Sequence, residues 1–267
     1  MCDIKGQNSI LTWIDTQTAD SLPRSIAIYG EFGAGKHLLT KYISKKFNWE
    51  IVNLAGRLDQ DTLNDIISEV TPKLYLIEAD KLTIKDQSSI LKFVEEPLKN
   101  AHIIITAEYP DSILPTIYNR CYPIVLKKYP ADLLTSFVTD KSKVSLILKV
   151  ATTPGQVINY QQLDLDSIDK LAVKFIDKIN LASYTNTLSI SNRLAYKDEK
   201  DKYDPDVSIK LVLINLVEKI KQTSYNNDIK FIDKTKELID KLQTKNVNKQ
   251  YLIEKYLSEI WLLFHEV

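Results

Sequence analysis

The stretch GEFGAGKH, residues 30–37, constrains the fold of this chain more than any other, because glycine is scarce elsewhere. Of six glycines in 267 residues, three lie between positions 30 and 35. The apolar run SIAIY precedes them, and KHLLTKYISKKF, with apolar residues at helical spacing, follows. Strand, glycine loop and helix in this order form the context of a phosphate-binding loop, since glycine lets backbone N–H groups wrap phosphate oxygens at a helix N-terminus.

Five residues of this loop are candidates for a nucleotide site. Gly30, Gly33 and Gly35 stand where the backbone must approach phosphate closely, and Lys36 would add a positive charge at the outer phosphates. His37 occupies the position of a magnesium-binding serine or threonine, and imidazole is a poor substitute for that hard oxygen ligand. The alternative is a tight strand-to-helix turn that needs glycine for steric reasons only. The sequence therefore predicts no required cofactor and, at most, weak binding of ATP or ADP.

An ATPase site of this kind also needs two acidic residues after a later buried strand, one for magnesium and one to polarise the attacking water. The segment LYLIEAD supplies Glu78 at the first position, but Ala79 stands where the second carboxylate belongs. Glu78 and Asp80 could equally cap a helix or face solvent at the strand end. Together with His37, the missing carboxylate predicts that the chain has no ATPase activity of its own.

Apolar runs alternate with amphipathic segments between residues 25 and 108, which is typical of a parallel sheet covered by helices. The runs are SIAIYG, WEIVNLA, KLYLIEA and AHIIITAE. From about residue 130 helical periodicity takes over. The expected fold class is α/β followed by all-α. We expect a nucleotide-binding-like α/β domain over residues 1–128, a small helical domain over 129–163 and a second helical domain over 164–267.

Charge and cysteine content narrow the functional classes. Lys plus Arg and Asp plus Glu each total 35, so any DNA contact must be local or shared with partners. Cys2 and Cys121 make neither a disulfide framework nor a metal cluster, which fits a reducing cytoplasm. Residues 37–77 contain no cysteine, so a four-cysteine zinc module there is excluded. The first residues show no signal peptide or membrane span, and we expect a cytoplasmic protein without membrane partners.

Several longer segments resemble the subunits of bacterial sliding-clamp loaders, in particular the delta prime type of DNA polymerase III. ILKFVEEP is similar to a family helix that ends in a Leu-Glu-Glu-Pro-like turn, and LPTIYNRC to a segment that ends in Ser-Arg-Cys. IKGQNSILTWI resembles the family segment before the loop, ATTPGQV its lid motif, and VNKQYLIEKYLSEIW its last collar helix. These matches occur in the family's order and cover nearly the whole chain.

The resemblance implies an AAA+ domain with a P-loop and a parallel sheet, a small helical lid and a C-terminal helical collar for oligomerisation. It implies a hetero-oligomeric ring with delta and gamma/tau type subunits. The family's ring uses ATP to open a sliding clamp and place it on primer-template DNA. Delta prime resembles the motor subunits in fold but acts as a stator, with a loop that is often degraded.

The resemblance also implies two functional residues outside the loop. By the match of LPTIYNRC, Arg120 is the candidate arginine finger, which would reach the γ-phosphate held by a neighbouring subunit; Asn119 replaces the family's serine. Thr106 matches the sensor position that reads the γ-phosphate or its attacking water. The alternatives are a surface arginine that precedes a strand and a threonine at a strand end. Gln156 stands where motor subunits carry a nucleotide-sensing arginine in the lid.

Three functional hypotheses remain open at this point. The first is a clamp-loader stator that supplies Arg120 in trans. The second is an active motor subunit or an independent ATPase in which His37 and Glu78 are tolerated variants. The third is a sheet domain that binds no nucleotide and has a purely structural role.

Overall fold

The computed structural model describes residues 4–54, 70–98, 100–167 and 169–170, separate helical residues between 207 and 238, and residues 248–265. The chain forms two compact units. The first comprises residues 1–137 and 152–156, and the second comprises residues 138–151 and 157–267. The three-domain division with boundaries after residues 128 and 163 stays a prediction.

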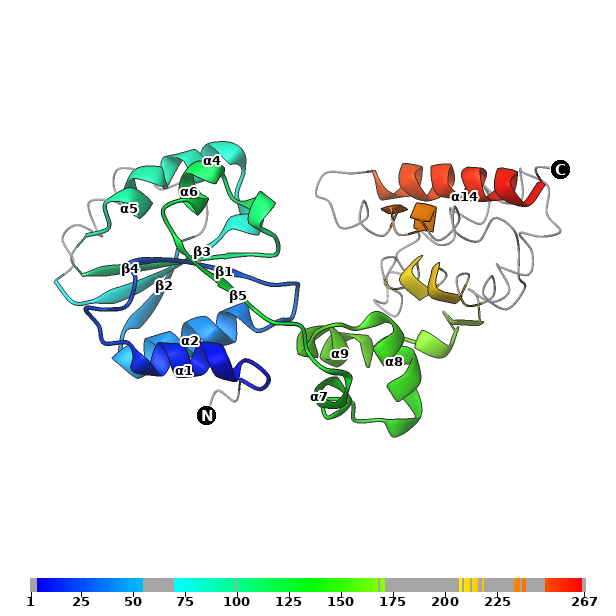
Figure 1. The fold of residues 1–267 in the computed structure, drawn as a ribbon, viewed down its shortest axis with the longest axis horizontal. Helices are drawn as coiled ribbons and strands as arrows, with labels where there is room; N and C mark the ends of the chain where they lie inside the picture. The colour runs from blue at the N-terminus through cyan, green and yellow to red at the C-terminus, as the bar shows by residue number, and fades with distance from the viewer. Residues whose placement is uncertain are drawn as a thin grey trace. The chain divides into compact units, whose positions relative to one another are not determined.

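A parallel sheet of five strands forms the centre of the first unit (Figure 1). The strands are β1 (Ser25–Tyr29), β2 (Glu50–Leu54), β3 (Lys73–Glu78), β4 (Ala101–Ala107) and β5 (Tyr122–Val125). Their order is β2-β3-β4-β1-β5, and every pairing is parallel. The predicted parallel α/β fold is confirmed. All residues of β1 and β4 are buried, which explains their continuous apolar sequences.

Strand β5 is absent from the four apolar runs that the sequence singled out. It is short and forms one edge of the sheet, with only Ile124 of its four residues buried. Proline at position 123 is tolerated there, because an edge strand can leave one side of its backbone unpaired. A short edge strand with a proline carries a weak sequence signal.

Helices cover both faces of the sheet. Helices α1 (Asn8–Thr16) and α2 (Lys36–Phe47) lie on one face, and α4 (Ile84–Ser89), α5 (Leu91–Glu95) and α6 (Pro115–Tyr118) lie on the other (Figure 1). The side chains of β4 alternate between the two cores: Ile104 packs with α1 and α2, whereas Ile103 and Ile105 pack with α5 and α6. Burial of each such side chain contributes about 1.5–3 kcal/mol.

Shorter elements complete the first unit. They are the 3-10 helices η1 (Ala79–Lys81) and η2 (Pro110–Ser112), and α7 (Ala131–Thr135). The fully buried amide of Gln7 ties the segment before α1 to the segment after β5. Its Nε2 donates to the backbone oxygen of Lys127 at 2.9 Å, and its Oε1 accepts from the Lys127 N–H at 3.0 Å.

The elements described in the second unit are helical, as predicted for the C-terminal half. They include η3 (Lys141–Lys143), α8 (Val144–Val150), most of α9 (Pro154–Tyr160) and α14 (Lys249–His265). Most of residues 171–247, part of the predicted collar, lies outside the described residues. No helix within the described ranges is both long and apolar enough to span a membrane.

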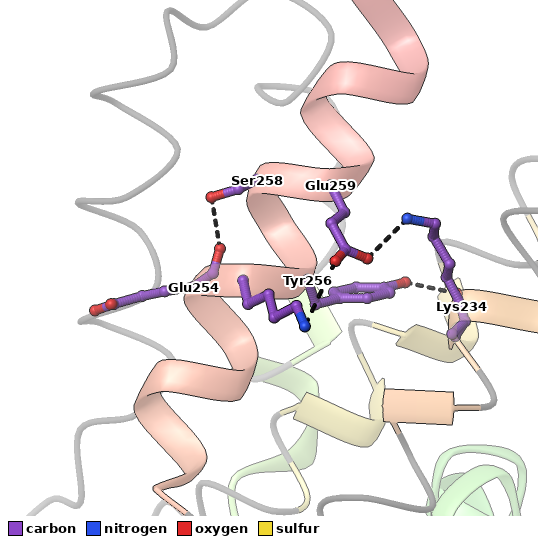
Figure 2. A network of polar contacts seen from close by, with 7 residues as sticks. Lys234, Glu254, Tyr256, Ser258 and Glu259 are labelled. Atoms are coloured by element: carbon purple, nitrogen blue, oxygen red, sulfur yellow. Dashed lines mark hydrogen bonds and ion pairs between the residues drawn. The ribbon is translucent and has the colours of Figure 1, made fainter.

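Polar contacts attach α14 to the short segment around residue 235, within the second unit (Figure 2). The buried hydroxyl groups of Tyr256 and Thr235 are hydrogen bonded at 2.6 Å. Beside them, Lys234 Nζ lies 2.8 Å from Glu259, and Lys255 lies 4.0 Å from the same carboxylate. Because a buried hydroxyl without a partner would be costly, the Tyr256–Thr235 bond favours an orientation of α14 in which Tyr256 faces the segment around residue 235.

Candidate functional site

The glycine loop lies at the carboxyl edge of the sheet, directly after β1. The Gly30 N–H donates to the backbone oxygen of Ala107 at the end of β4, at 3.2 Å. Gly33 and Gly35 have positive φ angles of 79° and 96°, which side chains with a Cβ rarely adopt. Helix α2 begins at Lys36, so strand, loop and helix follow one another as the sequence predicts.

The Lys36 ammonium lies within its own loop. Its Nζ donates to the backbone oxygens of Gly30 at 2.5 Å and Glu31 at 3.2 Å. Burial lowers the pKa of Lys36, and the nearby carboxylates of Glu108 and Asp80 work in the opposite direction. The ammonium group that was expected to bind phosphate therefore lies at the loop, where it is hydrogen bonded to two backbone carbonyl groups.

The segment Thr152–Gln156, which the sequence relates to a lid motif, packs directly against the loop. Thr153 Oγ1 donates to the backbone oxygen of Phe32 at 2.7 Å, and the Gly155 N–H donates to the backbone oxygen of Gly33 at 3.0 Å. A Cβ on Gly155 would lie 2.4 Å from the Gly33 Cα, so the two glycines are in direct backbone contact. Apart from the glycine at position 155, no feature of the sequence indicates this contact.

The Gln156 side chain is bonded within its own segment. It is buried, and its Oε1 accepts from the Thr152 N–H at 2.8 Å and from the Thr152 hydroxyl at 3.0 Å. The Thr152 hydroxyl also lies against a carboxylate oxygen of Glu31, and its single proton serves one of these two acceptors at a time. The amide of Gln156 thus holds its own segment together.

The acidic motif lies beside the loop at the same edge of the sheet. Glu78 ends β3 and is paired in register with Thr106 of β4, which is paired in turn with Ile28 of β1. The Glu78 carboxylate lies 2.9 Å from Lys81 Nζ and 3.8 Å from His37 Nε2. The structure therefore brings the predicted residues Glu78, Thr106 and His37 together. The Glu78 carboxylate, which would bind magnesium, is already paired with Lys81.

Asp80 and Thr106 lie close to the acidic end of β3. Asp80 Oδ2 accepts from the Glu108 backbone N–H at 2.9 Å, so Asp80 links the segment after β3 to the segment after β4. Thr106 is 2% exposed, so its hydroxyl lies beneath the surface of the sheet edge. In the described part of the chain, no group of three or more His, Cys, Asp or Glu residues is placed to hold a metal ion.

Arg120 lies between α6 and β5, near the end of the sheet where β1 and β5 begin. Tyr122 of β5 is paired with Ile26 near the start of β1, whereas the loop follows the end of β1. The residues from Ile26 to Gly30 span about 13 Å along the strand. No hydrogen bond or ion pair joins Arg120 to a loop residue among those described.

The Arg120 guanidinium is held by two partners instead. Its Nε lies 2.6 Å from Glu95 Oε1, and its Nη1 donates to the backbone oxygen of Thr116 at 2.6 Å. Glu95 ends α5, in the segment LKFVEEP. The sequence singled out this segment by resemblance, but it did not identify Glu95 as the partner of Arg120.

The fold and the region around Arg120 match known proteins of two kinds. Residues 50–130 match the family model described as DNA polymerase III, delta subunit. The DNA polymerase III subunit delta' of Bacillus subtilis is 44% identical over 50 residues, which are 18% of this chain and 15% of that protein. The chain thus aligns with less than a sixth of the length of this relative.

Two solved structures from one organism align with nearly the whole chain at low sequence identity. A variant of RuvB from Thermotoga maritima superposes with a TM-score of 0.50 at 12% identity, over 98% of this chain and 87% of RuvB. A DNA polymerase III gamma subunit-related protein from the same organism gives a TM-score of 0.46 at 13% identity, over 96% of this chain and 99% of that protein.

The five-stranded parallel sheet with its glycine loop defines an α/β fold that is similar to the fold of RuvB. Residues 50–130 resemble the delta subunits of DNA polymerase III. The predicted resemblance to the delta prime type is confirmed over a stretch of 50 residues. That stretch contains Glu78, Glu95, Thr106 and Arg120.

Proposed function

We propose that this chain is a delta prime-like stator of a DNA polymerase III clamp loader that supplies Arg120 to the ATP site of a neighbouring subunit. The observation that carries the proposal is the position of Arg120. It lies within the matched stretch, near the amino ends of β1 and β5, whereas its own glycine loop follows the carboxyl end of β1. An arginine in that position suits a nucleotide held by another chain. A guanidinium at the developing charge of phosphoryl transfer stabilises the transition state.

The state of the loop supports a role without ATP hydrolysis. His37 replaces the magnesium ligand, Ala79 replaces the second carboxylate, and Lys81 pairs with Glu78. Catalysis at a P-loop depends on a bound metal and an oriented water, so the loss of both sets of groups removes the main contributions to rate. In addition, the segment that resembles a lid motif packs directly on the loop through the contact between Gly33 and Gly155.

The proposed assembly follows from the same family likeness. The chain would join delta and gamma/tau type subunits in a hetero-oligomeric ring in the cytoplasm. It would meet the sliding clamp and primer-template DNA through that complex. The balanced charge, 35 basic and 35 acidic residues, agrees with DNA contacts that are shared within the ring.

Co-purification tests this assignment directly. The chain, tagged in its native source, should bring down delta and gamma/tau type subunits of DNA polymerase III in a complex that survives gel filtration. Identification of the captured proteins by mass spectrometry is the measurement. Capture of none of these subunits at any tag position would contradict membership of the ring.

An active ATPase is the second candidate, because Lys36, Glu78 and Thr106 lie near one another at the same edge of the sheet. For the stator, we expect calorimetry with ATP or ADP and magnesium to give a dissociation constant of about 1 mM or weaker. We expect no steady-state hydrolysis by the isolated chain, since His37 and Ala79 lack the required groups.

The matched variants for this experiment are Lys36→Ala and Lys41→Ala. Both lysines belong to α2, but Lys41 is exposed and lies away from the loop carbonyls. If the chain is a stator, neither variant should differ from the wild type in ATP hydrolysis, which should be absent in all three. Micromolar binding, together with turnover that is lost in Lys36→Ala and retained in Lys41→Ala, would establish the motor instead.

A further inference from the structure

The pair Glu95–Arg120 joins two helices on one face of the sheet. Glu95 ends α5, and Arg120 follows α6. The two side chains are 34% and 41% exposed, so a neighbouring chain can reach the guanidinium while the pair is partly shielded from water. Partial shielding strengthens the attraction between the two charges relative to a fully exposed pair.

The contacts of Arg120 use only part of its guanidinium. A guanidinium has five N–H donors, and the contacts to Glu95 and Thr116 use the Nε–H and one N–H of Nη1. The second N–H of Nη1 and both N–H groups of Nη2 have no partner among the described residues. Those groups form the edge that binds two phosphate oxygens in a bidentate contact.

We propose that Glu95 is a positioning residue: its carboxylate fixes the guanidinium of Arg120 by the Nε edge and leaves the Nη edge for the γ-phosphate of a neighbouring subunit. This inference rests on the proposed function of Arg120. It assigns a role to the last residue of α5, which contacts neither its own loop nor the reacting phosphate.

The backbone that carries Glu95 is itself firmly held. The two preceding residues, Phe93 and Val94, are buried in the core beneath α5. The backbone oxygen of Val94 accepts from the Ser25 hydroxyl at 3.1 Å, which anchors this end of the helix to the start of β1. A carboxylate on an anchored backbone limits the rotamers that a long arginine side chain samples, and this lowers the entropy cost of reaching the phosphate.

An opposite role for Glu95 makes the opposite prediction. A carboxylate that only competed with phosphate for Arg120 would hold the finger back, and its removal would raise the turnover of the neighbour. A carboxylate that orients Arg120 makes its removal harmful. Partly exposed ion pairs contribute little to folding, so neither role predicts a large change in stability.

The test is the ATPase of a ring reconstituted from this chain and the delta and gamma/tau type subunits of the same source, stimulated by primed DNA and the clamp. Glu95→Gln should lower kcat at the served site about 10- to 100-fold with little change in KM for ATP, because a misplaced group loses transition-state contact. The Tm of the isolated variant should match the wild type. Glu95→Asp, which keeps the charge, should recover part of the rate.

The matched control is Glu96→Gln. Glu96 is the next residue, is exposed, and has no ion pair of its carboxylate in the described part of the chain. It should leave kcat unchanged. In an Arg120→Ala background, Glu95→Gln should have no further effect, because the two residues act through one contact.

The outcomes separate this inference from the proposed function. If Arg120→Ala leaves turnover unchanged, the proposed function fails. If Arg120→Ala lowers turnover but Glu95→Gln equals or exceeds the wild type, only the positioning role of Glu95 fails. A loss in Glu95→Gln that Glu96→Gln reproduces would also overturn it, since a general charge effect would then explain both.

Discussion

Arg120→Ala should slow ATP hydrolysis at the neighbouring site of a reconstituted clamp-loader ring by about 1,000-fold or more. The guanidinium would stabilise the charge that develops on the γ-phosphate, and alanine offers no donor in its place. The side chain is 41% exposed and its contacts are to Glu95 and the Thr116 backbone, so its removal leaves both cores intact. The fold and the assembly of the ring should therefore survive.

Single-turnover hydrolysis is the sharpest measurement, because a ring with several ATP sites averages them in the steady state. In the Arg120→Ala ring, one fraction of the ATP should be hydrolysed slowly while the remainder keeps its rate. Arg120→Lys should also be slow, since a lysine keeps the charge but lacks the planar fork of N–H donors.

Lys92→Ala provides the control for loss of one positive charge on the same face. Lys92 is an exposed residue of α5, three positions before Glu95. Its removal should leave both the amplitudes and the rates of hydrolysis unchanged. An Arg120→Ala ring whose sites all hydrolyse ATP at the wild-type rate would remove the finger role.

The sequence was sufficient to predict the parallel sheet, because strands buried on both faces are continuous apolar runs. It was not sufficient for β5, where Pro123 and three exposed residues conceal an edge strand. Contacts distant in sequence account for most of the remaining features. The approach of Gly155 to Gly33 joins segments more than a hundred residues apart, and no local pattern specifies it.

In the candidate site, too, single residues could be predicted from the sequence, but their distant contact partners could not. The defects at His37 and Ala79 were visible in the sequence, since each departs from a position with known chemistry. Arg120 was identified by resemblance alone. Its partner was ambiguous in the sequence, because LKFVEEP offers two adjacent acids, and only the end of α5 decides that Glu95 faces the guanidinium while Glu96 is the helix cap.

His102 should make the first unit less stable as the pH falls from about 6.5 to about 4. Its ring stacks on Trp49, with 3.9 Å between the ring centroids, and is 4% exposed. Its buried Nδ1 has no hydrogen-bond partner among the described residues. Burial lowers the pKa of His102 to about 4, and the positive charge of Arg24 acts in the same direction.

The sign follows from the proton balance. Below the ordinary histidine pKa of 6.5 the unfolded chain binds a proton at His102, whereas the folded chain does so only near pH 4. Proton binding therefore lowers the free energy of the unfolded state relative to the folded state by up to about 1.4 kcal/mol per pH unit, or about 3 kcal/mol over the whole window. Below about pH 4 both states are protonated and His102 causes no further loss.

Urea unfolding between pH 7.5 and 4 measures this effect, with Trp49 as the fluorescent probe in a chain that carries Trp13→Phe and Trp261→Phe. Carboxylates also titrate in this range, so the informative quantity is the difference in pH dependence between this chain and its His102→Phe variant, which keeps an aromatic ring but cannot titrate. His102→Gln serves as a second variant, since phenylalanine is larger than histidine and can overpack the site.

Both His102 variants should lose about 3 kcal/mol less than the parent between pH 7.5 and 4. If they show the same pH dependence as the parent, the folded chain binds the proton as readily as the unfolded chain, and the buried ring of His102 does not resist charging.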